Sequence, residues 1–163
     1  MKKNTYKYVV KVAHELSELE RNNLRELTFR TQSGSHLSLL LDDIEKKLEN
    51  GFKPQWPVCL ALNDGSIVGW AASGMKISFP PKKARKEKRK FSNVGAYVSY
   101  SYRRKGIAFN LMKRLIRRLS YDGIVAYAYP HDSKSKAFFK KLGFYQENKD
   151  VHWLISSWRH DVV

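Results

Sequence analysis

The segment Val98-Ser99-Tyr100-Ser101-Tyr102-Arg103-Arg104-Lys105-Gly106-Ile107-Ala108 has the pattern of a strand end, a tight turn and the start of a helix. The first amides of an α-helix have no acceptor within the helix, and the helix dipole adds a partial positive charge beside them. A pyrophosphate suits that position. Gly106 allows the backbone a close approach to the phosphates, and Ala108 keeps the next turn thin. The segment predicts a phosphate-binding turn, although a helix that merely begins with basic residues and a glycine has the same pattern.

Regular periodicities extend outward from this segment in both directions. Apolar residues recur every three or four positions through residues 106–119, which predicts the strongest helix of the chain. Other helices are expected from Ser17, over 37–48 and over 132–142, and strands over 6–12, 58–62, 67–74, 94–98, 123–129, 144–145 and 151–158. The order βααβββαβαββ predicts one mixed α/β domain.

Local signals mark where several of these elements begin and end. Ser17 and Glu20 have the spacing of a capping box, and Asn50-Gly51 is typical of a helix C-terminus. Residues 31–35 are expected to be a break between helices. Residues 63–66, Asn-Asp-Gly-Ser, predict the turn of a β-hairpin.

Length and composition limit the class of protein. A chain of 163 residues fits a single domain, and 42% hydrophobic residues can form a core. A single cysteine, Cys59, excludes an internal disulfide, and the scattered histidines do not have the spacing of a metal site. The N-terminus lacks the pattern of a secretory signal, and no apolar run reaches the roughly 20 residues of a membrane span. These observations predict a cytoplasmic protein without a metal or a membrane partner.

The net charge of +16 is distributed unevenly along the chain. Residues 1–81 hold 11 Lys or Arg and 9 Asp or Glu, whereas residues 82–163 hold 20 and 6. The densest run lies in the loop expected before the fourth strand and comprises Lys82, Lys83, Arg85, Lys86, Lys88, Arg89 and Lys90. This run is a candidate contact for a polyanion such as nucleic acid or an acidic protein, or else a solvated hairpin tip.

Three motifs in the same order and spacing resemble the GNAT superfamily of N-acetyltransferases. They are Arg103-x-x-Gly106-x-Ala108, the run Phe139-Lys140-Lys141-Leu142-Gly143-Phe144, and Ile67-Val68-Gly69 at a hairpin strand. The resemblance spans nearly the whole chain. It implies a single GNAT-like domain over residues 1–163, in which a splayed, mixed sheet of six to seven strands has helices on both faces.

The resemblance also implies that acetyl-coenzyme A is the cofactor. Its pantetheine arm would pair with the backbone of Tyr97 and Val98, as an added strand does. The cofactor-binding residues would then be Tyr97, Val98, Arg103, Arg104, Lys105, Gly106, Ile107 and Ala108, with Asp132 and Ser135 at the start of the later helix. An amine would attack the thioester directly. Many relatives pair through their C-terminal strands, and for this chain a monomer or a homodimer is expected.

Two positions depart from the family pattern. In the family, a glutamate on or near the fourth strand often acts as the general base, but residues 91–102 of this chain contain no carboxylate. The tyrosine that often acts as the acid is replaced by Phe139. Tyr129, Ser135 and His131 are substitute candidates for the acid, and each also has an ordinary structural interpretation.

Two functions therefore remain open. The first is an acetyl-CoA-dependent N-acetyltransferase whose amine acceptor belongs to an acidic or nucleic-acid-linked macromolecule. The second is a GNAT-fold module that has lost catalysis and uses its basic face to hold nucleic acid or a protein. The intact turn at Arg103–Ala108 favours the first, and the missing tyrosine and glutamate favour the second.

Overall fold

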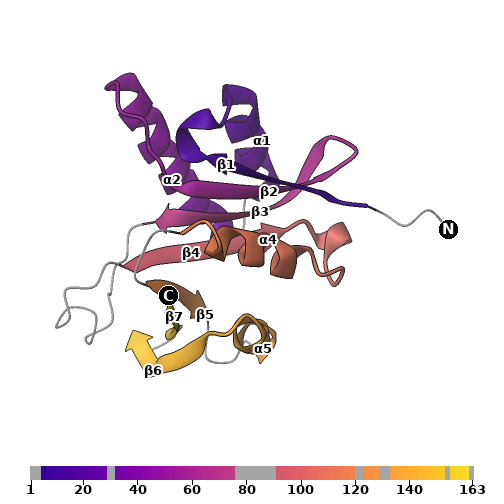
Figure 1. The fold of residues 1–163 in the computed structure, drawn as a ribbon, viewed down its shortest axis with the longest axis vertical. Helices are drawn as coiled ribbons and strands as arrows, with labels where there is room; N and C mark the ends of the chain where they lie inside the picture. The colour runs from indigo at the N-terminus through magenta and orange to yellow at the C-terminus, as the bar shows by residue number, and fades with distance from the viewer. Residues whose placement is uncertain are drawn as a thin grey trace. The chain divides into compact units, whose positions relative to one another are not determined.

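The computed structural model of this protein describes residues 5–28, 32–75, 91–119, 123–128, 133–152 and 155–161. In chain order the elements are β1 (Lys7–Val12), η1 (Ala13–Glu15), α1 (Glu18–Thr28), α2 (Gln32–Glu49), β2 (Pro57–Asn63), β3 (Ser66–Met75), β4 (Phe91–Val98), η2 (Tyr100–Tyr102), α4 (Ile107–Ile116), β5 (Gly123–Ala128), α5 (Ser133–Lys141), β6 (Tyr145–His152) and β7 (Ile155–Asp161) (Figure 1). The predicted α/β class and the predicted order of strands and longer helices are confirmed.

The chain divides into two compact units. The first comprises Met1–Met75 and Gly95–Arg118, and the second comprises Lys76–Val94 and Leu119–Val163. Strand β4 begins in the second unit and ends in the first. None of the helices in the described ranges is long and apolar enough to cross a membrane.

The first unit is built on strands in the order β1-β2-β3-β4. β1 is antiparallel to β2, with Val9 opposite Leu60, and β2 is antiparallel to β3. The Ser99 amide, just beyond β4, donates to the Val68 carbonyl near the start of β3, so these two strands also run in opposite directions. Within the first unit the sheet is therefore four-stranded and antiparallel, and β5, β7 and β6, which follow β4 in the strand order, belong to the second unit.

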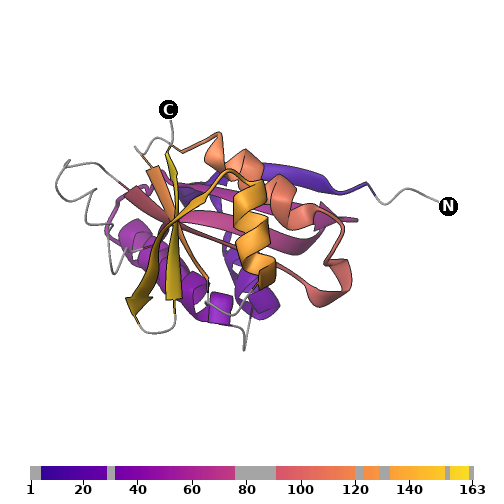
Figure 2. The same cartoon turned by 90° about the horizontal axis from the view of Figure 1, so that it is seen from below.

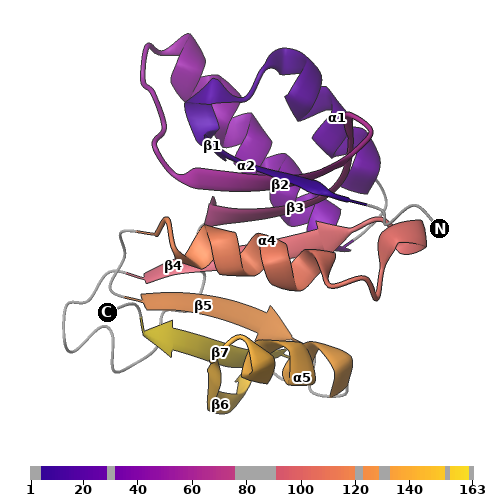
Figure 3. The same cartoon turned by 45° about the vertical axis from the view of Figure 1, so that its right-hand side comes forward.

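Helices cover both faces of the sheet in the first unit (Figure 2). Trp70 of β3 belongs to a buried cluster with Leu24 of α1 and Ile44 of α2. A Cβ added to its neighbour Gly69 would instead meet Leu111 of α4. Because adjacent strand residues point to opposite faces, α1 and α2 lie on one face and α4 lies on the other. Helix α4 runs along the strands and packs against β1, β2 and β3 (Figure 3).

The predicted ends of two helices are confirmed in atomic detail. The Glu20 amide donates to Ser17 Oγ at 3.1 Å, and the Ser17 amide donates to Glu20 Oε2 at 2.9 Å, which completes the capping box. At the end of α2, the Phe52 amide donates to the Lys47 carbonyl, and the Gly51 amide donates to the Leu48 carbonyl. With φ of +78° at Gly51, this is a Schellman motif.

The predicted hairpin between β2 and β3 is also confirmed. Asp64 and Gly65 both have positive φ, +48° and +81°, which is the backbone of a type I′ turn. Cys59 of β2 is buried, as expected for a small apolar residue on a strand.

The second unit contains the start of β4 followed in space by β5, β7 and β6. β4 pairs with β5 in parallel over Phe91–Asn93, and β7 is antiparallel to both β5 and β6. Helix α5 ends in a second Schellman motif, in which the Phe144 amide donates to the Phe139 carbonyl and Gly143 has φ of +91°. The rings of Phe139 and Phe144 lie 5.4 Å apart, the apolar contact that commonly accompanies this motif.

Several predicted boundaries are wrong. α2 begins at Gln32, within the expected break, because the burial of Leu37, Leu41 and Ile44 overrides the weak helix propensity of the serines and glycine at its start. β4 begins at Phe91 rather than at 94, and the short helix η2 was not predicted. The closing strands are β6 over Tyr145–His152 and β7 over Ile155–Asp161, since no glycine or proline marks their boundary.

Candidate functional site

The connection from β4 to α4 forms the candidate site, and its backbone has an unusual conformation. Gly106 is the N-cap residue of α4, with φ of +75°, and no side chain caps this helix end. Arg104 also has a positive φ, +60°, which is uncommon for a residue with a Cβ atom. The first amides of α4 are therefore presented without a competing side-chain acceptor.

The space around Gly106 is open. A Cβ atom added there would have Asn110 Nδ2, at 3.9 Å, as its nearest neighbour. The next residue, Ile107, is buried at 1% exposure and anchors the first turn of α4, whereas Ala108 is half-buried. The turn is thus anchored by the buried Ile107 and open at Gly106, and this arrangement would allow a phosphate group to approach closely.

Three exposed cations, Arg103, Arg104 and Lys105, surround this turn. Arg103 Nε donates to the Val98 carbonyl at 2.9 Å, and its guanidinium lies 5.5 Å from the ring of Tyr100. Arg103 is therefore positioned by the end of β4. Lys105 lies over the ring of Tyr102 at 5.4 Å. The sequence places these charges in the turn, but only the structure distinguishes the fixed Arg103 from the more loosely held Lys105.

Side chains that the sequence analysis did not single out support the turn. Asn110 Nδ2 donates to the Gly106 carbonyl at 3.1 Å, and Asn63 Nδ2 donates to the Tyr102 hydroxyl at 3.3 Å. The ring of Tyr6 meets that of Tyr102 edge to face at 6.3 Å. Asn110 follows Gly106 by one helical turn, a spacing that could have identified it. Asn63 and Tyr6 could not have been found in this way, because they are distant from the turn in the sequence.

Tyr8 of β1 lies under the exposed side of α4. Burial raises the pKa of Tyr8, and a hydrogen bond with Asn110 and the charge of Arg114 offset this only in part. The Arg114 guanidinium lies 4.8 Å from the Tyr8 ring. Tyr8 is therefore a neutral support for α4 at physiological pH.

Close packing holds α4 against the end of β4. A Cβ atom added to Gly69 would lie 3.0 Å from the Tyr97 carbonyl oxygen, 3.2 Å from Val98 Cγ2 and 3.3 Å from Leu111 Cδ1. This explains the glycine of the Ile67-Val68-Gly69 motif, since a larger residue would push these groups apart. Val98 is buried, and Tyr97 is half-buried against the cluster beneath α1 and α2.

The remaining predicted residues, which were expected to act as acids, to contact the cofactor or to contact a polyanion, are described only in part. Tyr129, His131 and Asp132 lie outside the described residues, as does the basic run of Lys82–Lys90. Ser135 belongs to α5, but its side chain is outside the description. Phe139 is half-buried and packs against Phe138 and Phe144. In the described ranges, no group of His, Cys, Asp and Glu could hold a metal ion.

Comparison with known proteins gives one family match. The profile of the acetyltransferase (GNAT) family matches residues 21–144 of this chain, which include the β4–α4 turn and all three motifs. A search of curated proteins found no significant match.

Many solved structures have the same fold. An N-acetyltransferase from Staphylococcus aureus Mu50 is 22% identical, with a TM-score of 0.65, over 95% of this chain and 98% of that one. A ribosomal-protein-alanine N-acetyltransferase from Brucella melitensis is 20% identical, with a TM-score of 0.65, over 94% and 99%. A GNAT phosphinothricin acetyltransferase from Sinorhizobium meliloti, solved in complex with acetyl-CoA, is 20% identical, with a TM-score of 0.63, over 97% and 89%. At these identities the likeness concerns the fold.

Proposed function

Because this chain belongs to the GNAT acetyltransferase family, we propose that it transfers the acetyl group of acetyl-CoA, the cofactor of that family, to an amine. The observation that carries the proposal is the start of α4. Gly106 has a positive φ and open space around it, and no side chain caps the helix. Such a helix start suits a pyrophosphate.

The cofactor-binding residues follow from this placement. The amides of Gly106, Ile107 and Ala108 would hold the pyrophosphate, with Arg103, Arg104 and Lys105 around it. The backbone of Tyr97 and Val98 would hold the pantetheine arm, and Asp132 and Ser135 are proposed as further contacts. Arg103 supports this role best, because its bond to the Val98 carbonyl joins the phosphate end of the site to the strand end.

The larger architecture is part of the proposal. We infer one domain with a splayed sheet of six to seven strands, and two facts support it. Neither compact unit is a single stretch of sequence, because the chain passes between the units at residues 75, 94 and 118. The described register between β4 and β5 covers Phe91–Asn93 only, although β4 continues to Val98.

The chemistry depends mainly on positioning. Acetyl-CoA would supply a thioester carbonyl, and the chain would orient it for direct attack by the amine. Proximity and orientation can contribute several kcal/mol to such a reaction. Tyr129 and Ser135 are proposed as acids for the leaving thiolate, since Phe139 has no hydroxyl. With no carboxylate in residues 91–102, an acceptor amine with a low pKa is favoured, because it is already neutral.

The acceptor is proposed to be an acidic or nucleic-acid-linked macromolecule, on the basis of the net charge of +16. A cytoplasmic location and a monomer or homodimer are proposed with it.

The second candidate function is a binding module without catalysis. It is favoured by Phe139, whose ring serves the end of α5 where the family often has an acid.

The test is a thermal-shift titration with acetyl-CoA, followed by measurement of CoA release with pooled amine, peptide and aminoacyl-RNA acceptors. Stabilisation together with CoA release supports the transferase. Stabilisation without release from any acceptor supports the binding module, and no stabilisation contradicts both the site and the transferase.

A matched pair of variants locates the site. Gly106→Trp should abolish the acetyl-CoA shift, because the indole would fill the place of the pyrophosphate. Gly51→Trp is the control, since Gly51 has nearly the same φ, +78° against +75°, and equally open surroundings at the end of α2. A normal shift in Gly106→Trp would contradict the site.

A further inference from the structure

The exposed side of α4 and the turn that follows it carry a set of four cations, Lys113, Arg114, Arg117 and Arg118, which we call the α4 basic face. All four are exposed, whereas the residues that alternate with them on the helix, such as Leu111 and Leu115, are fully buried. Lys113 and Arg117, like Arg114 and Arg118, lie one helical turn apart, so the cations form two neighbouring columns.

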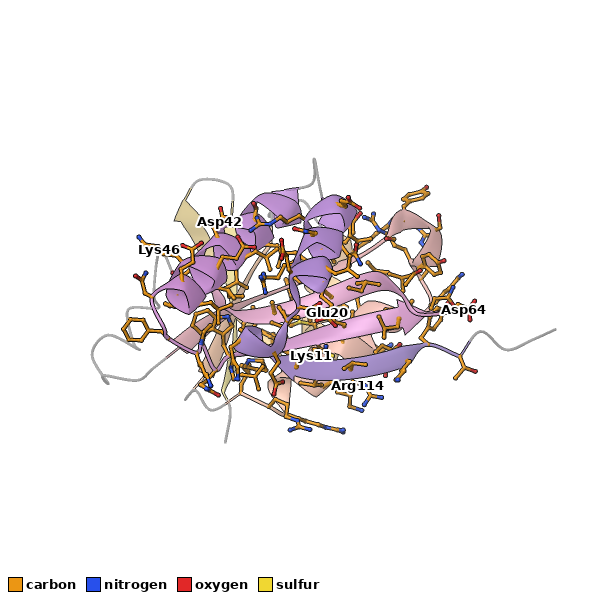
Figure 4. All side chains as sticks on the ribbon, turned by 90° about the horizontal axis from the view of Figure 1, so that it is seen from above. Lys11, Glu20, Asp42, Lys46, Asp64 and Arg114 are labelled. Carbon is orange, nitrogen blue, oxygen red and sulfur yellow. The ribbon has the colours of Figure 1, made fainter. Side chains whose placement is uncertain are left out.

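No carboxylate neutralises these charges within the part of the chain that the structure describes. The carboxylates of the first unit belong to η1, α1 and α2, apart from Asp64 in the hairpin turn. The ion pairs there join Lys11 to Glu20, Arg21 and Arg25 to Glu45, Arg25 to Asp42, and Lys47 to Asp43. Figure 4 shows Arg114 beside β1, away from Asp42 and Lys46 on α2. Among the described residues of this unit, the side of α1 and α2 therefore holds paired charges, and the side of α4 holds cations without a carboxylate partner.

The folding of α4 does not by itself account for this set. Cations in the last turn of a helix complement its dipole, which suits Lys113 and Arg114. Arg117, the C-cap residue, shares this benefit, but Arg117 and Arg118 also place like charges about one turn from the first two, and this repulsion opposes the gain from the dipole. A bound polyanion would remove this repulsion.

The α4 basic face is also too far from the cofactor turn to serve the same phosphates. Arg117 follows Gly106 by eleven positions, which at about 1.5 Å per residue is roughly 16 to 17 Å along the helix axis. Arg103, Arg104 and Lys105 already surround the turn. The cations of the α4 basic face therefore suit a separate anion, one that carries charges repeated along its length.

The polyanion could be an acidic protein or a nucleic acid, and the exposed side chains of α4 distinguish between the two. Specific protein interfaces have an apolar centre. Among the described residues, the exposed large hydrophobic side chains are Leu19, Phe52 and Tyr100, and none of them belongs to α4. Phosphate recognition requires no apolar centre, and the guanidinium group matches phosphate geometry. We propose that the α4 basic face binds the phosphodiester backbone of a nucleic acid.

This inference deepens the proposed function, because a nucleic-acid-linked acceptor would be held by this face, but the binding itself is measured without acetyl-CoA. The experiment titrates the full chain into a short, fluorescein-labelled, mixed-sequence single-stranded RNA, and into DNA of the same sequence, at several salt concentrations. Binding to both should weaken steeply as salt rises, because each phosphate contact contributes about 0.7 to the slope of log K against log salt.

The test variant is Lys113→Glu/Arg117→Glu, which spares Arg114 and its contact with Tyr8. It should weaken binding at least about 10-fold and lower the salt slope by roughly 1.4, since two phosphate contacts are lost. The control, Lys46→Glu/Lys53→Glu, changes the net charge equally at exposed cations outside α4 and should bind nearly as the parent does. Both variants should keep the acetyl-CoA shift, which separates this face from the cofactor site.

Four outcomes would overturn the proposal. The parent chain fails to bind either nucleic acid, or the two double variants lose binding equally, which would indicate a net-charge effect. Acetyl-CoA displaces the RNA, which would assign the RNA to the cofactor's phosphate site. Polyglutamate binds as tightly as RNA with the same dependence on Lys113 and Arg117, which would indicate an acidic protein partner.

Discussion

At the residue scale, Phe139 has a packing role at a position where the family often has a tyrosine that acts as the acid. Its ring packs against the ring of Phe144, and the Schellman motif at the end of α5 brings these two residues together. Phenylalanine suits this packing as well as tyrosine does, so nothing in the fold requires a hydroxyl. The substitution affects the proposed reaction more than the stability of the chain.

Phe139→Tyr should therefore raise the rate of CoA release with a fixed acceptor, because a hydroxyl at this position can protonate the leaving thiolate. A well-placed general acid typically raises the rate by roughly 10²-fold or more. The kcat of acetyl transfer measures the effect. Phe138→Tyr is the control, since Phe138 is adjacent, equally half-buried and on the same helix. Equal rates in the parent and both variants would contradict the expectation that a hydroxyl at position 139 acts as the acid.

At the element scale, the capping box at the start of α1 connects sequence, stability and pH. Partial burial by itself would raise the pKa of Glu20, but hydrogen bonds from Lys11 and from the Ser17 amide hold that pKa below its usual value. A lowered pKa in the folded state means that the carboxylate stabilises the fold above pH 4.5, the ordinary value. This contribution is lost as the pH falls through the lower, folded-state pKa.

Glu20→Gln should consequently lower the free energy of unfolding at neutral pH by up to about 1 kcal/mol, because glutamine can still accept from the Ser17 amide but loses the ion pair with Lys11. The difference between parent and variant should shrink when the pH is taken well below 4.5. Urea denaturation at the two pH values measures it. Glu26→Gln is the control on the same helix, because Glu26 is exposed and outside the capping box. A difference that stays constant with pH would contradict the role assigned to the Glu20 carboxylate.

At the scale of the whole molecule, Cys59 reports on unfolding. It is fully buried on β2, and burial raises the pKa of its thiol to about 11, although Arg114 opposes the shift. The thiolate is the reactive form, so the folded chain holds Cys59 both inaccessible and protonated.

Alkylation of Cys59 by iodoacetamide at neutral pH should therefore be slow in the folded protein and fast in urea. Saturating acetyl-CoA should slow it further, since a ligand that binds only the folded state lowers the unfolded population. Mass spectrometry of the intact chain follows the reaction, and Cys59→Ala gives the background. Rapid labelling of the folded chain would contradict the burial of β2.

Much of the fold could be predicted because many of its signals are local. The Ser17 cap, the Asp64-Gly65 turn and the C-terminus at Gly51 depend on backbone preferences of a few neighbouring residues, and all three were placed correctly. The start of α2 was placed wrongly because weak breakers at Gly34 and its neighbours do not overcome the packing of the rest of the helix. The division between β6 and β7 has no local signal and follows from strand pairing.

The sequence by itself determined the order of elements, the GNAT motifs and the helix start at Gly106, because periodicity and glycine conformation act over a few residues. Tertiary structure alone decided the rest. It brought Asn63 to Tyr102, fixed Arg103 on Val98 and pressed Gly69 against Tyr97 and Leu111. It also separated the carboxylates of α1 and α2 from the cations of α4, because helices placed on opposite faces of a sheet keep their charges apart.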